Sequence, residues 1–193
     1  TGAFLGSAVL LRGSVLALAA AGQRLDLLHV GGLLAGLATV CAAIAHRRGA
    51  LTLPTWTRPP AFPSWRSLDG WLGSLGALGL GAVVLSAVGD PLSGFDTVFR
   101  WDFLARQMLE HASLAFYPPV SSADFAIYGW CDGFAPLVSS LYLWTYLCLG
   151  QASAPATALV VVGPAVLLGV AVWQLAHALA GSRAASWAIA LLA

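Results

Sequence analysis

The chain has few charged residues and no lysine. Charged residues make up 9% of the sequence, against about 25% in an ordinary soluble domain, and the mean hydropathy is +0.83. The net charge is +1, and no basic run is longer than Arg47-Arg48, so nothing in the charge pattern favours a nucleic-acid partner. The composition predicts an integral membrane protein whose partner is the lipid bilayer. An all-arginine basic set beside abundant alanine, leucine and glycine further indicates a GC-rich bacterial gene, and hence a bacterial plasma (inner) membrane.

Cysteine is also scarce. The three cysteines, Cys41, Cys131 and Cys148, are odd in number and show no CxxC spacing, which excludes a disulfide framework or a cysteine metal cage. Cys41 and Cys148 fall inside apolar runs, where we expect them to be buried as small hydrophobic residues. Only Cys131, beside a polar segment, is a candidate for exposure.

Long apolar runs fill most of the remaining sequence. A helix needs about 20 residues to cross the hydrocarbon layer, and lipid admits only helices or closed barrels as spanning structures. Because these runs are continuous and do not alternate with polar residues, they predict helices. The expected spans are residues 3–22, 27–45, 71–89, 134–150, 157–179 and 184–193, and the Gly163-Pro164 pair predicts a bend in the fifth.

The expected fold is therefore all-α, a polytopic transmembrane helix bundle forming a single domain over residues 1–193. Its last apolar run is short, and the sequence begins at Thr1 without an initiator methionine. We therefore expect the chain to be a fragment of a longer protein.

The loop at residues 46–70 predicts the orientation in the membrane. It carries five basic or histidine side chains against one acid, Asp69: His46, Arg47, Arg48, Arg58 and Arg66. Loops rich in arginine tend to stay in the cytoplasm. Counting the spans from there puts the loop at residues 90–133 on the extracytoplasmic face.

That outer loop holds most of the acid in the chain. Six of the eight carboxylates lie in it: Asp90, Asp96, Asp102, Glu110, Asp124 and Asp132. Residues 95–112 lack glycine and proline and predict an amphipathic surface helix. Its expected polar side carries Asp96, Arg100, Gln107, Glu110 and His111, and its expected apolar side carries Val98, Trp101, Leu104, Met108 and Leu109.

Two acid–arginine pairs stand at i, i+4 spacing in this helix, Asp96 with Arg100 and Asp102 with Arg106. One interpretation is that both are helix-surface ion pairs, each worth about 0.2–0.5 kcal/mol. The other is a site in which a carboxylate acts as base or metal ligand and a guanidinium binds a phosphate. The sequence leaves both interpretations open.

The outer loop resembles a known family. The residues that carry the resemblance are Phe95-Asp96, Arg100-Trp101, Ala105-Arg106, Met108-Leu109, Tyr117-Pro118-Pro119 and Pro136-Leu137 ahead of an aromatic span. Together they resemble the first outer loop of the GT-C membrane glycosyltransferases, most closely protein O-mannosyltransferases and lipid A aminoarabinose transferases. The resemblance implies an enzyme that moves a sugar from a polyprenyl-phosphate carrier to an acceptor on the extracytoplasmic face.

The resemblance also implies site residues. Asp96 and Asp102 would be catalytic, and a divalent cation is a possible cofactor. The substrate-binding residues would be Arg100, Arg106, Tyr117 and Asp132. Two alternatives to an enzyme are a non-catalytic membrane scaffold and a transporter or channel fragment with an acidic mouth. The transporter would need charges inside several spans, for which the sequence offers Arg12 and His177.

Overall fold

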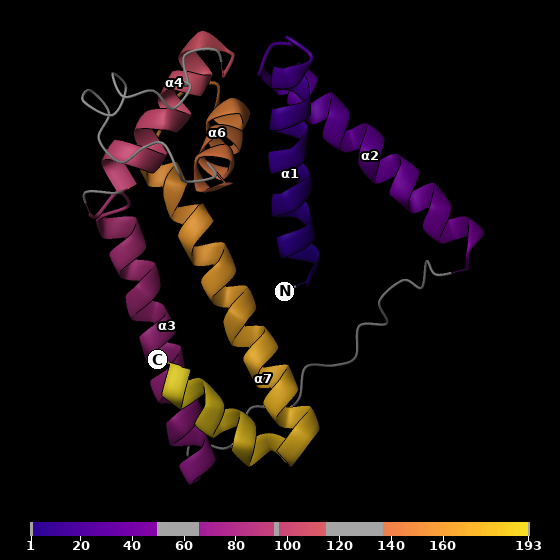
Figure 1. Cartoon of the computed structure of the whole chain (residues 1–193). Coiled ribbons are helices and arrows are strands. Elements are labelled where there is room, and N and C mark those ends of the chain that lie inside the picture. The colour runs from indigo at the N-terminus through magenta and orange to yellow at the C-terminus, as the bar shows by residue number, and fades with distance from the viewer. Residues whose placement is uncertain (1, 50–65, 95–96, 115–136, 193) are drawn as a thin grey trace, which may run out of the picture. The chain divides into compact units, whose positions relative to one another are not determined.

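The computed structural model describes residues 2–49, 66–94, 97–114 and 137–192 (Figure 1). All regular elements in these ranges are helices, and they contain no strand. The predicted all-α fold is therefore confirmed. Of the predicted site residues, Asp96, Tyr117 and Asp132 lie outside these ranges.

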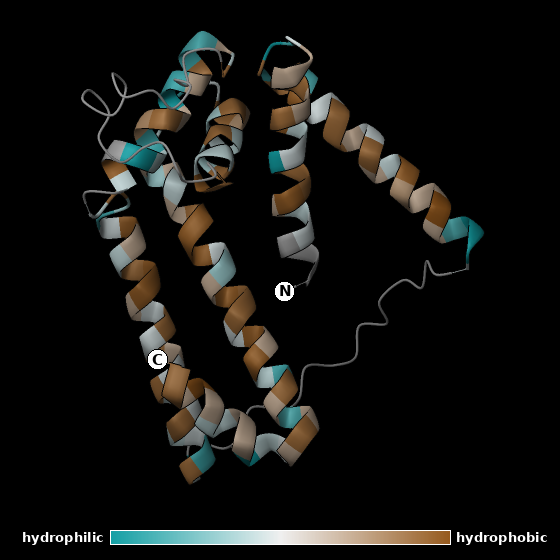
Figure 2. Cartoon of the chain, in the orientation of Figure 1, coloured by the Kyte–Doolittle hydropathy of each residue, from teal (hydrophilic) through white to brown (hydrophobic). Residues whose placement is uncertain are grey.

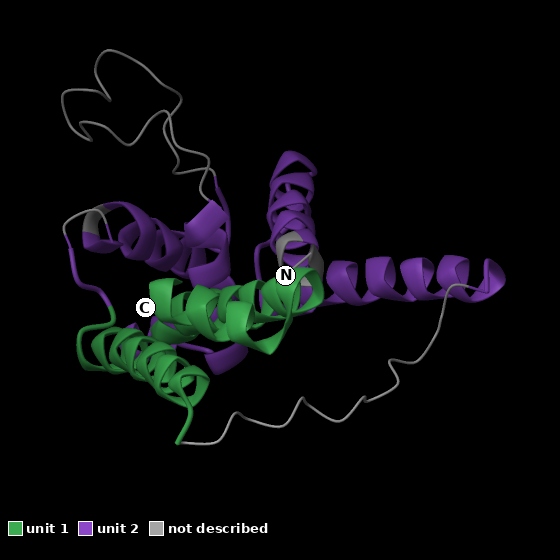
Figure 3. Cartoon of the chain, turned by 90° about the horizontal axis from the view of Figure 1, so that it is seen from below, with its two compact units in different colours: residues 1, 53–91, 158–193 green, residues 2–52, 92–157 purple. Residues whose placement is uncertain are grey.

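The described helices form two compact units (Figure 3). One, here called the α3–α7 unit, contains α3 (Leu68–Gly89) and nearly all of α7 (Ala154–Leu192). The other, here called the α1–α6 unit, contains α1 (Gly2–Ala20), α2 (Leu27–Arg47), the π-helix η1 (Thr97–Asp102), α4 (Phe103–His111) and α6 (Leu137–Leu149). Each unit is described separately below.

Among the described residues, three helices are long and apolar enough to cross a membrane: α2, α3 and α7 (Figure 2). Helix α2 leaves large apolar side chains such as Leu28, Val40 and Ile44 exposed. Such a surface is stable where lipid covers it, which identifies the chain as a membrane protein. Cys41 on α2 and Cys148 on α6 are exposed, so the expectation that both are buried is wrong. Cys41 lies on the largely exposed helix α2, and Cys148 lies in the exposed last turn of α6.

Helices α1 and α2 form a hairpin whose turn is joined to the end of α4. Gly22 adopts a positive φ of 65° in this turn, a conformation that glycine adopts without strain. The side chain of Leu25 is fully buried, and its backbone N–H donates a hydrogen bond of 2.7 Å to the Ala112 carbonyl. Ala112 itself has a left-handed backbone and ends α4.

In the α3–α7 unit, α7 breaks at Gly181, where φ is 82° and ψ is −174°. This break falls between the expected spans 157–179 and 184–193, and the backbone angles stay helical through the Gly163-Pro164 pair. Beyond the break, Arg183 Nε lies 3.3 Å from Asp69 Oδ1 on α3. A side chain added at Gly76 of α3 would overlap the Ile189 side chain. The positive φ of Gly181 thus allows the end of α7 to pack closely on α3.

The predicted surface helix at residues 95–112 is helical from Thr97 to His111, but it begins as a π-helix. A π-turn holds more residues than an α-turn, so it shifts the faces of the helix that follows. The buried stripe consists of Asp102, Ala105 and Met108. Met108 is buried, as its place on the expected apolar side predicts, but Val98, on the same expected side, is exposed, so the prediction is wrong at Val98.

Candidate functional site

Asp102 is a buried carboxylate at the junction of η1 and α4. It is only 4% exposed, and both η1 and α4 pack against α6. Burying an ionised carboxylate without partners costs several kcal/mol or more, so such groups are normally paired and hydrogen-bonded. The partners of Asp102 are therefore the first feature to identify.

Both carboxylate oxygens of Asp102 accept a hydrogen bond from a side chain. Arg106 Nε, one turn further along the helix, donates to Oδ2 over 2.7 Å. The hydroxyl of Tyr146, a fully buried residue of α6, donates to Oδ1. We call these three residues, Asp102, Arg106 and Tyr146, the Asp102 cluster. The cluster joins the start of α4 to α6, because Tyr146 lies 44 positions after Asp102 in the sequence.

The Asp102 cluster is asymmetric in exposure. The Arg106 side chain is 45% exposed, whereas that of Asp102 is 6% exposed. The bond to Asp102 uses the Nε donor, and a guanidinium carries four further N–H donors on its two terminal nitrogens. The arrangement therefore presents a half-exposed cation whose inner edge is held by a buried anion. Such a planar donor group can bind a phosphate or a carboxylate through two parallel hydrogen bonds.

The structure shows one of the two predicted acid–arginine pairs. The i, i+4 ion pair between Asp102 and Arg106 is confirmed. Arg100 is half-buried on η1. The pair of Asp96 with Arg100, and the predicted roles of Tyr117 and Asp132, involve residues that are not described.

Tyr146 is the site residue that the sequence did not reveal. It lies in an apolar run that predicts a membrane span, and nothing local connects it with the acidic loop. The available signal was weak: two tyrosines, Tyr142 and Tyr146, recur one turn apart in this run, and a buried phenol needs a hydrogen-bond partner. That signal indicates a polar contact but cannot identify Asp102 as the acceptor.

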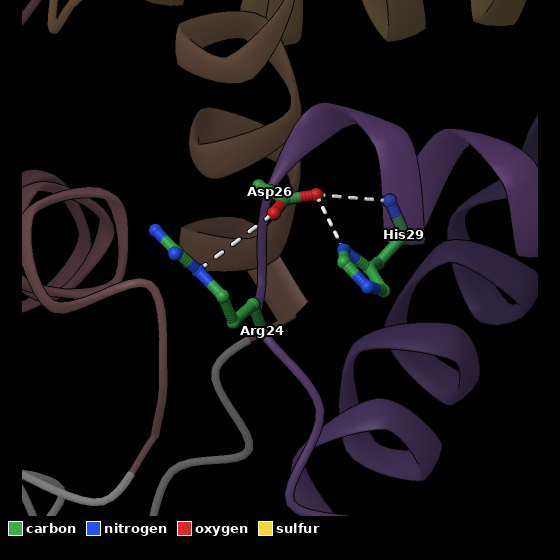
Figure 4. Close-up of polar contacts among 3 residues, drawn as sticks. All are labelled: Arg24, Asp26 and His29. Atoms are coloured by element: carbon green, nitrogen blue, oxygen red, sulfur yellow. Dashed lines mark hydrogen bonds and ion pairs between the residues drawn. The ribbon is translucent and has the colours of Figure 1, made fainter.

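A second polar cluster caps the start of α2 (Figure 4). Asp26 Oδ1 accepts a hydrogen bond of 2.9 Å from the His29 backbone N–H and lies 2.7 Å from His29 Nδ1. The backbone bond from His29, followed by its side-chain bond, lowers the pKa of Asp26. Arg24 Nε is 3.9 Å from Asp26 Oδ2, and its side chain is largely exposed. These contacts are those of a helix cap, which satisfies the open donors at a helix start.

The sequence offers a divalent cation as a possible cofactor, and Arg12 and His177 as the charges that the transporter alternative requires. Within residues 2–49, 66–94, 97–114 and 137–192, no three histidine, cysteine or acidic side chains gather as metal ligands. Arg12 lies half-buried on α1, and its Nε and Nη1 atoms are buried. His177 is exposed on α7.

Comparison with known protein families, characterised proteins and solved structures finds no match for the chain. The resemblance of the outer loop to GT-C glycosyltransferases therefore stays a prediction from the quoted residues. The function has to be argued from the Asp102 cluster and from the membrane setting of the chain.

Proposed function

We propose that the chain is part of a membrane glycosyltransferase that moves a sugar from a polyprenyl-phosphate carrier to an acceptor. The reaction would take place on the extracytoplasmic face of a bacterial plasma membrane. The observation that carries the proposal is the half-exposed Arg106, held by the buried Asp102 in a unit of apolar helices. A carrier lipid diffuses within the bilayer, so its phosphate reaches such a unit at the depth of the headgroups. Arginine is well suited to bind that phosphate.

The proposal assigns Arg106 to the carrier phosphate and Asp102 to positioning Arg106. A general base needs an oxygen within hydrogen-bond reach of the proton that it removes. Both oxygens of Asp102 already accept hydrogen bonds, from Arg106 and Tyr146. This favours a positioning role for Asp102 over the catalytic role that the resemblance implies.

The base in this proposal is Asp96, the other acid that the resemblance assigns to catalysis. The acceptor hydroxyl oxygen bonds to the anomeric carbon of the sugar while its proton passes to Asp96. The bond between that carbon and the carrier phosphate breaks, and the polyprenyl phosphate leaves. Arg106 stabilises the negative charge that the leaving phosphate gains. Arg100, Tyr117 and Asp132 would contribute to substrate binding, as the resemblance implies.

The test is sugar transfer by the full-length protein from a polyprenyl-phosphate sugar donor in mixed micelles. Arg106→Gln should raise the KM for the donor about tenfold or more, because charge-assisted hydrogen bonds to a phosphate are worth about 1.5–3 kcal/mol each. Asp96→Asn should lower kcat with little change in KM. Asp90, an exposed acid at the end of α3, provides a matched control, since Asp90→Asn should leave both constants unchanged. Transfer that neither Arg106→Gln nor Asp96→Asn affects would disprove the proposal.

A further inference from the structure

The structure assigns to Tyr146 a role as the positioning residue of the phosphate site. Its hydroxyl holds the Asp102 carboxylate, and that carboxylate in turn orients Arg106 toward the ligand. This inference rests on the proposed function, because the ligand it concerns is the phosphate of a lipid carrier. Tyr146 itself is fully buried and acts through Asp102, so it need not touch the ligand.

The first reason is that Arg106 and Asp102 cannot fix each other. An i, i+4 ion pair on a helix is weak, and a half-exposed arginine retains much of its rotamer freedom. A carboxylate is free to turn about its last bond unless a second donor holds it. Tyr146 supplies that donor from a different helix, α6, and binds the oxygen that Arg106 does not use. The two bonds together set the plane of the carboxylate, and with it the direction from which Nε approaches.

The second reason comes from a comparison with Tyr142, another buried tyrosine on the same helix. Tyr142 lies one turn before Tyr146 and is 2% exposed. Within the described part of the chain, no hydrogen bond joins Tyr142 to Asp102. Both tyrosines therefore have buried rings, but Tyr146 alone of the two is bonded to the carboxylate that holds Arg106. Tyr142→Phe is the matched control for Tyr146→Phe.

The experiment uses the full-length protein in detergent mixed micelles and two probes, a long-chain polyprenyl monophosphate and the corresponding polyprenol without phosphate. We expect Tyr146→Phe to weaken binding of the monophosphate about tenfold and to leave polyprenol binding unchanged. Tyr142→Phe should bind both probes like the wild type. In the Arg106→Gln variant there is no guanidinium left to orient. Adding Tyr146→Phe to that variant should therefore cause no further loss of monophosphate binding. An equal loss in that variant would overturn the inference.

A second measurement needs no lipid. An arginine-specific dicarbonyl reagent such as phenylglyoxal labels guanidinium groups, and mass spectrometry locates the label. Tyr146→Phe removes the hydrogen bond from Tyr146 to Asp102, so Arg106 is held less firmly and its labelling should become several-fold faster. Tyr142→Phe removes no bond to Asp102, so its labelling rate should equal that of the wild type. Asp102→Asn, which nearly preserves the shape of the side chain, should speed it as well and serves if Tyr146→Phe does not fold.

The two measurements separate the inference from the proposed function. If Arg106→Gln loses the preference for the monophosphate while Tyr146→Phe keeps wild-type binding and labelling, the role of Tyr146 is overturned and the function stands. If the wild type binds both probes equally but Tyr146→Phe labels faster at Arg106, the function is overturned and Tyr146 still positions Arg106. Unchanged labelling in both Tyr146→Phe and Asp102→Asn overturns the inference in either case.

Discussion

Replacing Asp102 by alanine should destabilise the α1–α6 unit, and the loss should depend on Tyr146. The change removes the acceptor of a fully buried phenol hydroxyl, and leaving such a group unsatisfied costs about 1–3 kcal/mol. It also removes the ion pair to Arg106, which contributes at most about 1 kcal/mol because that side chain is 45% exposed. The expected cost of Asp102→Ala is therefore about 1–4 kcal/mol of unfolding free energy.

The double variant Asp102→Ala/Tyr146→Phe tests this reasoning most directly. It removes the acceptor and the donor together, so no buried group is left unsatisfied. Its cost should fall short of the sum of the two single costs by about 1–2 kcal/mol, within the range of couplings measured for contacting residues. Hydrogen bonds between membrane helices average about 0.6 kcal/mol, so a value above that average would reflect the charge on Asp102.

The measurement is equilibrium unfolding in detergent micelles, followed by far-ultraviolet circular dichroism. The control pair is Asp102→Ala with Tyr142→Phe, which share no hydrogen bond and should be close to additive. A coupling between Asp102 and Tyr146 below about 0.3 kcal/mol, the usual error of additivity, would refute the hydrogen bond as a source of stability.

Three further predictions concern other parts of the chain. Gly76→Ala should destabilise the α3–α7 unit by about 1–3 kcal/mol in a thermal unfolding assay, because the new Cβ would overlap the Ile189 side chain and lie 3.0 Å from its backbone carbonyl. Gly81→Ala is the control: its new Cβ meets nothing within 4 Å, so it should be neutral or stabilising in that assay. Ala112→Gly should raise the unfolding free energy by up to about 1 kcal/mol, since alanine is strained at φ 49° and glycine is not; a loss of stability would contradict that strain. Because the folded pKa of Asp26 is lowered, its charge stabilises the fold fully above its ordinary pKa of 3.8 and ceases to do so as the pH falls through the folded value. Asp26→Asn should keep the helix cap and remove this part of the pH dependence of stability, and an unchanged profile would show that another group is responsible.

The stability predictions separate the packing of the candidate site from packing elsewhere in the chain. The single and double variants of Asp102 and Tyr146 test whether a contact between helices stabilises the candidate site. The Gly76 variant tests a close approach of two helices that is independent of the site. A loss of sugar transfer in a variant that unfolds normally would then be attributable to the site itself.

The sequence by itself determined the helical class and the nearest polar contact. Its continuous apolar runs exclude spanning strands, because lipid leaves no partner for an open strand edge. The pairing of Asp102 with Arg106 was also predictable, since residues four apart lie on the same side of a helix. Both inferences depend only on neighbours along the chain.

The tertiary structure decided which face is buried and what Asp102 contacts. The π-turn at Thr97–Asp102 is not visible in the helical period of the sequence, and Val98, on the expected apolar side, is exposed. Beyond Gly181 the end of α7 lies against Gly76 of α3, a contact that the apolar runs do not predict. Tyr146 bonds to Asp102 across 44 positions. The physical reason is common to all three: a helical period is a property of a local stretch of sequence, whereas a buried hydrogen bond or a close approach requires a partner that only folding brings near.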